Sequence, residues 1–189
     1  MLLLNCHYQD ESAASLLTQA LDEIETLTSG EAAFLCIGSD RHILDCLGPL
    51  IGTMIREKAH GLRVYGTLES PLHAGNLLEK WNRIRGQHKP GSIIAVDASL
   101  GHEEELGMIR LRDEPLRPGK ALLKGLPPIG DYCLTGVVSS RAETRLKSTH
   151  NGSLNAVYHI ASLISQAVVL WYNQGPKRPE MYLNDDGLI

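Results

Sequence analysis

The chain has 189 residues, of which 43% are hydrophobic and 21% are charged, and this length is enough for one domain that buries its own apolar core. The formal net charge is −4, and lysine and arginine are scattered along the chain, so the sequence lacks the basic signature of a nucleic-acid-binding protein. We therefore expect a single domain over residues 1–189 and no nucleic-acid partner.

The cysteines and the N-terminal residues indicate the cellular compartment of the protein. The four cysteines form no CxxC pair and no zinc-like spacing, which favours reduced thiols in an intracellular protein. The apolar run that starts at Met1 ends after three leucines and lacks a basic flank, so it does not resemble a secretion signal. No run approaches the ~18 apolar residues that a membrane-spanning helix needs. We expect a cytoplasmic protein without a membrane partner.

Helical and strand-like patterns alternate along the chain. From Ser12 to Thr28, leucine and isoleucine recur at three- and four-residue spacing, which predicts an amphipathic helix. Short, almost entirely apolar runs predict strands that are buried on both faces. In chain order the predicted elements are a helix at 12–28, a strand at 32–37, a helix at 47–59, a strand at 63–68, a helix from Pro71 to about Arg85, a strand at 92–99, a half-exposed edge strand at 108–113, a strand at 132–138 and a helix at 153–173.

This order of elements predicts an α/β fold, with a mainly parallel sheet, helices on both of its faces and an antiparallel edge strand. The core is expected over about residues 30–174, preceded by the N-terminal helix and followed by a loosely packed tail at 175–189. Residues 101–130, rich in proline and glycine, are interpreted as an irregular excursion within the same domain.

Two aspartates follow strands of the predicted sheet. Asp45 lies in the loop after the strand at 32–37, and Asp97 lies near the end of the strand at 92–99. If these two strands are neighbours in a 2-1-3 order, their carboxyl ends meet at the switch point where α/β proteins bind ligands. Two carboxylates in one crevice do not both ionise cheaply, so one tends to keep its proton near neutral pH. Such a pair is equipped to activate water against an amide or, with a third ligand, to hold a divalent metal ion.

Both aspartates also have structural interpretations that the sequence leaves open. Asp45 is suited to capping the helix that follows it, although Pro49 favours Gly48 as the cap, because proline prefers the first helical position. Asp97 is suited to a turn in which its side chain accepts a backbone hydrogen bond.

Five further residues are secondary candidates for the same crevice: Asp40, His42, His73, Thr135 and Ser139. Asp40 adjoins Arg41, which indicates a solvated loop position more than a catalytic one. The loop that holds Asp45 lacks the glycines of a phosphate-binding loop. No nucleophile elbow accompanies the serines, which argues against a serine hydrolase.

Six blocks of sequence stand out in combination: FLCIGSDR, LDCLGPLIGT, VYGTLESPLHAGNL, IIAVDASLG, PGKALLKGLPPIGDYCLTGVV and TRLKSTHNGSLNAVYHIA. Together they span about residues 30–172 and resemble the YyaC family of sporulation proteins from endospore-forming bacteria. That family is similar in turn to the spore germination protease and to the hydrogenase maturation endopeptidases. The resemblance implies a phosphorylase/hydrolase-like, three-layer α/β/α sandwich.

The same resemblance implies site residues. In the germination protease, two aspartates are implicated in catalysis, one in a DALGP stretch and one in an AVDA stretch, which correspond here to DCLGP at Asp45 and AVDAS at Asp97. The hydrogenase endopeptidases bind nickel at acidic residues in these two positions and at a histidine after a later strand. Here the corresponding stretch reads LTGVVSSR and has no histidine, so the resemblance keeps the aspartate pair but not the nickel site.

The prediction is a sporulation-linked peptidase in which Asp45 and Asp97 activate water against a peptide bond, with no cofactor and with spore proteins as substrates. Two alternatives stay open. One is a non-catalytic regulatory or binding protein of sporulation on the same fold. The other is a metal-dependent maturation endopeptidase, in which Asp45 and Asp97 would hold the metal ion.

Overall fold

The computed structural model describes residues 1–28, 32–87, 92–118, 126–141 and 153–175. Its elements, with η for a 3₁₀ helix, are β1 (Leu2–His7), α1 (Ala13–Leu27), β2 (Ala33–Cys36), η1 (Ile43–Asp45), α2 (Leu47–Arg56), β3 (Arg63–Tyr65), α3 (Leu77–Gln87), β4 (Ile93–Gly101), η2 (Glu103–Glu105), β5 (Met108–Arg112), β6 (Tyr132–Ser140) and α5 (Leu154–Gln174). The predicted tail beyond Gly175 lies outside the described residues.

The six strands form one mixed sheet in the order β1-β5-β6-β4-β2-β3. β3, β2, β4 and β6 pair in parallel, whereas β5 pairs antiparallel with both β6 and β1. The predicted α/β fold, mainly parallel with antiparallel pairing at one edge, is confirmed. The order β3-β2-β4 is also the predicted 2-1-3 arrangement.

One prediction at that edge is wrong in detail. The segment at 108–113 forms β5, but β5 lies second from the edge because β1 pairs along its outer side. β1 has no counterpart among the predicted strands, because LLLNCH has an apolar run too short to show a strand period and its partner β5 is far along the chain. Long-range pairing of this kind leaves no local pattern.

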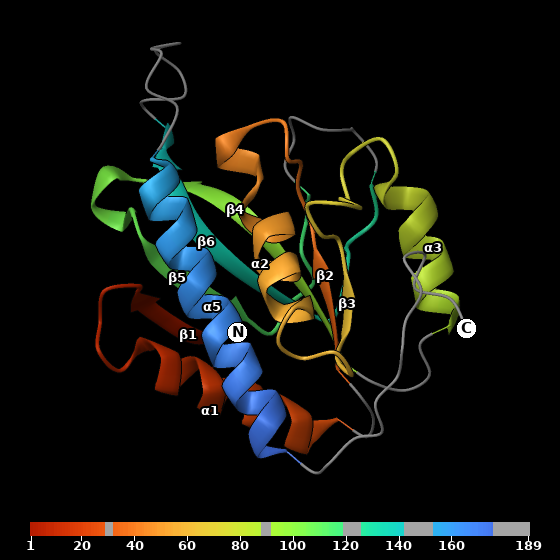
Figure 1. Ribbon diagram of the computed structural model, residues 1–189, viewed down its shortest axis with the longest axis horizontal. Coiled ribbons are helices and arrows are strands. Elements are labelled where there is room, and N and C mark those ends of the chain that lie inside the picture. The colour runs from red at the N-terminus through yellow and green to blue at the C-terminus, as the bar shows by residue number, and fades with distance from the viewer. Residues whose placement is uncertain (29–31, 88–91, 119–125, 142–152, 176–189) are drawn as a thin grey trace.

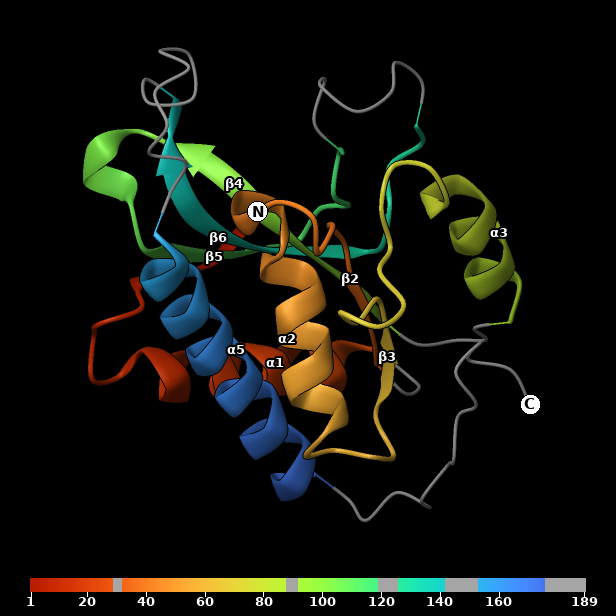
Figure 2. The same cartoon turned by 45° about the horizontal axis from the view of Figure 1, so that its top comes forward.

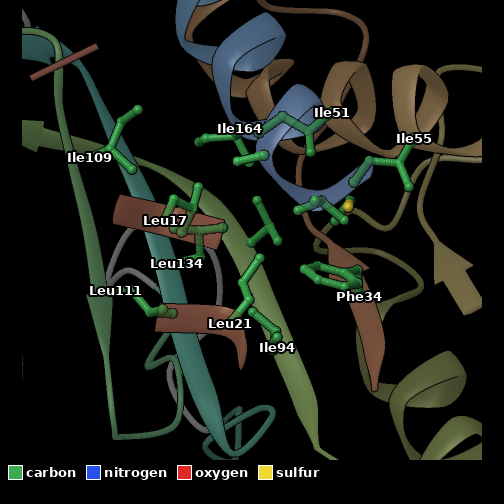
Figure 3. Close-up of a cluster of buried hydrophobic side chains, with 14 of the residues drawn as sticks. Leu17, Leu21, Phe34, Ile51, Ile55, Ile94, Ile109, Leu111, Leu134 and Ile164 are labelled. Carbon is green, nitrogen blue, oxygen red and sulfur yellow. The ribbon is translucent and has the colours of Figure 1, made fainter. Parts of the chain in front are cut away.

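Helices cover both faces of the sheet (Figures 1 and 2). α1, α2 and α5 pack on one face, where apolar side chains from these helices meet those of the strands (Figure 3): Leu17, Leu21, Phe34, Ile51, Ile55, Ile94, Ile109, Leu111, Leu134 and Ile164. On the other face, Leu77, Trp81 and Ile84 of α3 pack with Leu35 and Ala95 of the sheet. Each strand of the centre is therefore apolar on both sides, as parallel strands with helices on both faces must be.

α5 begins at a conventional N-cap and buries the face that the sequence predicts. The Ser153 hydroxyl accepts the Ala156 N–H at 3.4 Å, and the buried residues include Val157, Ile160 and Trp171. Contrary to the expectation from the sequence, this helix is long and apolar enough to cross a membrane by length and composition alone. Its buried residues belong to the core cluster that α1 and α2 share, which is the packing of a core helix.

Candidate active site

The loop between β2 and α2 is folded tightly against the end of β2. Gly38 has φ 145°, and a Cβ atom there would overlap the carbonyl oxygen of Asp45, which accepts the Ser39 N–H at 2.9 Å. Gly48, in α2, lies so close to β2 that a Cβ atom would overlap the backbone of Ile37. These two glycines therefore allow the loop to return over the strand end and fix the position of Asp45.

We expect Gly48→Ala to lower the free energy of unfolding by about 1–3 kcal/mol, because the added methyl group forces α2 away from β2. Gly86→Ala in α3 is the matched control, since an added Cβ there has nothing within 4 Å. That change should instead raise the free energy of unfolding by about 0.5–1 kcal/mol, because alanine is the better helix former. Urea unfolding of both variants checks the pair, and equal effects would contradict the close contact at Gly48.

Asp45 ends the 3₁₀ turn η1 and does not cap the next helix. α2 begins at Leu47 with Cys46 as its N-cap, and no side chain makes a capping hydrogen bond. The predicted cap at Gly48 is therefore wrong, because Pro49 is the third helical residue and not the first. The consequence drawn from it, that Asp45 stays outside the helix, still holds. Asp45 is half-buried without the helix-capping bond that its position suggested.

Asp97 lies in β4 one residue after the point where the β2 ladder ends at Val96. Its Oδ1 accepts the N–H of Ala98 at 2.8 Å. Burial raises the pKa of Asp97 to about 7; the Ala98 hydrogen bond acts in the opposite direction, and the charge of Asp45 raises it further. The structure thus brings Asp45 and Asp97 into electrostatic contact from separate parts of the chain.

The pKa of Asp45 is also raised, chiefly by burial, while His42 and His73 act in the opposite direction through their charge. Asp45 is half-buried and has two histidines that oppose the rise of its pKa, whereas burial raises the pKa of Asp97 to about 7. A pair of carboxyl groups with separated pKa values is the arrangement in which one acts as acid and the other as base.

Both predicted histidines lie near Asp45. His42 precedes η1, and its carbonyl accepts the Asp45 N–H at 2.9 Å. His73 Nδ1 accepts the Gly75 N–H at 3.1 Å, and its backbone N–H donates to Asn76 Oδ1 at 3.0 Å. Because Nδ1 accepts a hydrogen bond, the proton of the neutral ring lies on Nε2. Both rings are exposed, so they border the site and do not form its floor.

The three remaining secondary candidates differ in where they lie relative to the aspartate pair. Thr135 is buried and pairs directly with Asp97 across the β4–β6 ladder, so it lies beside that carboxyl group. Ser139 is also buried but pairs with Leu100, further along β6. Asp40 is exposed in the loop, in keeping with the interpretation of a solvated position. Of these three residues, only Thr135 is adjacent to the aspartate pair.

A polar row that the sequence analysis missed crosses the sheet at Asp97. Asp97 pairs with Thr135, Thr135 with Arg110 of β5, and Arg110 with Asn5 of β1. The Arg110 guanidinium donates to Glu105 Oε1 at 2.6 Å and to Asn5 Oδ1 at 3.1 Å, which fixes its position. The alternating arginines of MIRLR were the available sequence signal for this row. Which of them lies level with Asp97 depends on long-range strand pairing, which the sequence does not show.

Two more residues that the sequence analysis passed over support the site. Cys133 lies in β6 two residues before Thr135 and pairs with Ala95, and burial, followed by the Asp97 charge, raises the pKa of its thiol to about 12. It is therefore an uncharged packing residue and not a nucleophile. Asn76, directly before α3, positions His73 and donates to the Pro71 carbonyl at 3.1 Å. A polar residue just ahead of a helical period was the available signal for Asn76.

Within the parts of the chain that the structure describes, no three His, Cys, Asp or Glu side chains are grouped closely enough to hold a metal ion. Among the described residues, Asp45 and Asp97 therefore have no third side chain that would complete the ligand set of a metal-dependent maturation endopeptidase.

A family model described as "Protein of unknown function (DUF1256)" matches residues 5–167. The chain belongs to the DUF1256 family. Among its curated relatives is the uncharacterized protein YyaC of Bacillus subtilis strain 168, which is 34% identical over 165 residues, or 86% of this chain and 80% of YyaC. The resemblance to the YyaC family is therefore confirmed.

The fold of this DUF1256 protein is also found in a protease of known structure. The NiFe hydrogenase maturation protease HycI from Thermococcus kodakarensis KOD1 superposes with a TM-score of 0.56 over 82% of this chain and 99% of HycI. The two sequences are 15% identical, so the likeness establishes a common fold and not a common activity.

Proposed function

We propose that this DUF1256 protein is a cytoplasmic peptidase that hydrolyses peptide bonds of spore proteins with Asp45 and Asp97. The observation that carries the proposal is the pKa of Asp97, raised to about 7 by burial, with a contribution from the charge of Asp45. A carboxyl group that keeps its proton at neutral pH beside a second carboxylate is equipped for acid–base catalysis. The HycI-like fold and the YyaC relative are consistent with this proposal.

In the proposed reaction, the Asp45 carboxylate removes a proton from water, and the hydroxyl oxygen attacks the carbonyl carbon of the peptide. Asp97 donates its proton to the amide nitrogen, the C–N bond breaks, and the products are a carboxylic acid and an amine. The proton that Asp45 has gained returns to Asp97 through solvent. His73, with its proton on Nε2, would stabilise the Asp45 carboxylate before the attack.

The pH dependence follows from these roles. Since Asp97 acts as the acid, kcat/KM should fall about tenfold for each pH unit above its pKa of about 7. Since Asp45 acts as the base, the acid limb should lie above the ordinary carboxyl pKa, because burial raises the pKa of Asp45. Initial rates of cleavage measured across the acidic and alkaline ranges check both limbs. A rate that keeps rising well above neutrality would contradict the assignment of Asp97 as the acid.

The proposal is tested with acid-soluble proteins extracted from spores of Bacillus subtilis. The purified protein is incubated with the extract, and new peptide termini are identified by mass spectrometry, with and without a chelator. Termini that form equally in both samples support a metal-free peptidase. If a spore protein co-purifies with the chain but stays intact on either side of neutral pH, the protein is a binding module and the peptidase proposal fails.

A further inference from the structure

β4 continues beyond β2 at the end of the sheet where Asp97 lies. β2 pairs with β4 from Ala33 opposite Ile93 to Cys36 opposite Val96, whereas β6 stays paired with β4 as far as Gly101. Figure 2 shows the arrowhead of β4 running on past β2. Among the described residues, no strand pairs with β4 on the β2 side after Val96.

The backbone groups on that side can be assigned. The Ile37 N–H donates to the Val96 carbonyl at 2.7 Å, so the Val96 backbone faces β2. The β4–β6 register shifts between Ser99 and Leu100, but the extra residue, Val138, lies in β6. Backbone groups therefore still alternate along β4 itself, and those of Ala98 and Leu100 face the same side. The Ala98 N–H is already engaged by the Asp97 carboxyl group. The Ala98 carbonyl and the Leu100 N–H are the next acceptor and donor along this edge.

One residue of an added parallel strand satisfies these two groups. In a parallel ladder, a residue donates its N–H to one carbonyl of the neighbouring strand and accepts the N–H two residues further on. The Ala98 carbonyl and the Leu100 N–H have this spacing. An apolar side chain lies on the edge itself, since Leu100 is 37% exposed. The 3₁₀ turn η1, which contacts β4, exposes a second one, Ile43, at 46%. The edge thus suits an extended peptide that also carries apolar side chains.

We propose that the edge of β4 from Ala98 to Leu100 binds the substrate as an added strand, so that the substrate class is an unfolded, extended segment of a protein. This inference rests on the proposed function, because the edge begins at Asp97 and a peptide paired along it presents its backbone to the aspartates. Strand addition recognises the main chain, and side-chain pockets add selectivity. A folded surface loop without an extended segment does not bind in this way.

The test uses random linear peptides displayed on phage, selected on the Asp45→Asn variant so that bound peptide is not cut. In that background, Leu100→Pro removes the N–H on the open side, where a proline is compatible with an edge strand. We expect Leu100→Pro to weaken binding of the selected peptides about tenfold, the combined size expected for one lost backbone hydrogen bond and the lost leucine side chain. Leu100→Ala keeps the N–H and should cost only about two- to threefold, from lost side-chain contact.

A second measurement does not depend on the folding of the proline variant. A selected peptide is synthesised with a single N-methyl group placed at each position in turn, and binding to Asp45→Asn is measured. Strand addition predicts losses at the two peptide residues whose N–H groups reach the Ala98 and Leu100 carbonyls, and no loss at the residue between them, because alternate N–H groups point away from β4. Losses without this alternation, or equal binding by the proline and alanine variants, would overturn the inference. So would failure to select any peptide, or a dimer that Leu100→Pro dissociates, which would mean that two copies pair through this edge.

Failure of this inference and failure of the proposed function have different signatures. If spore proteins are cleaved and Leu100→Pro leaves kcat/KM unchanged, the peptidase proposal stands and strand addition is wrong. If peptides bind with the alternating pattern but nothing is cleaved by the unmodified protein, the edge is a recognition site and the peptidase proposal is wrong.

Discussion

Asp97→Asn is expected to lower kcat/KM for cleavage of spore proteins by about 10²–10⁴-fold, the usual contribution of a general acid. The amide of asparagine accepts the same hydrogen bond from Ala98 that the Asp97 carboxyl group accepts at 2.8 Å, but it has no acidic proton to give to the leaving amine. Asp45→Asn should produce a loss of similar size, because it removes the base that activates water. The measurement is the initial rate of product formation near neutral pH.

Asp40→Asn is the matched control for both substitutions. Asp40 lies in the same loop as Asp45, but its side chain is exposed, so the rate should stay within about twofold of the unmodified protein. The double variant Asp45→Asn/Asp97→Asn should be little worse than either single variant, because residues that act as one unit are not additive. Full activity in either single variant would exclude the aspartate pair as the catalytic centre.

The second prediction concerns stability and uses the same residue. The pKa of Asp97 is about 7 in the folded protein against an ordinary value of 3.8, so the folded chain binds more protons than the unfolded chain between these two values. The contribution of Asp97 to the free energy of unfolding must therefore decrease as the pH rises through this range and level off above it. A pKa difference of about 3 corresponds to at most about 4 kcal/mol.

Asp97→Asn removes this penalty because the amide is never charged. We expect the variant to be more stable than the unmodified protein above pH 7 and to have nearly the same free energy of unfolding near pH 4. Urea unfolding at a series of pH values measures the difference. Asp40→Asn, at an exposed position, should follow the unmodified protein throughout. A stability difference that does not change with pH would show that Asp97 is not held neutral by the fold.

If the Asp97→Asn variant is inactive but more stable than the unmodified protein, Asp97 has a catalytic role and not a structural one. A residue kept for packing or for a turn loses stability when it is replaced, whereas a group that is strained or desolvated for chemistry gains it. The turn interpretation of Asp97, based on its hydrogen bond to the next amide, predicts no gain in stability for Asp97→Asn at any pH, because asparagine accepts the same bond. The acid–base interpretation predicts a gain.

Local patterns in the sequence determined most of the elements. The three- and four-residue periods of α1 and α5, and the apolar runs of β2, β4 and β6, predict these segments because each buries one or both of its faces. β1 was missed, and α3 begins later than predicted, at Leu77. The reason for the late start is that residues 71–76 form a turn held by Asn76, which a proline-based prediction of a helix start does not detect.

The sequence by itself determined that Asp45 lies in the loop after one buried strand and Asp97 in a second buried strand, because short apolar runs mark such strands. That these two strands are neighbours was a condition of the prediction, and the sheet order supplied it. Only the tertiary structure decided that the charge of Asp45 reaches Asp97, that Thr135 lies beside it, and that Arg110 continues the row. It also decided that β4 continues past the end of β2. These facts depend on register and on the depth of burial, which arise when distant segments pack, so no local pattern encodes them.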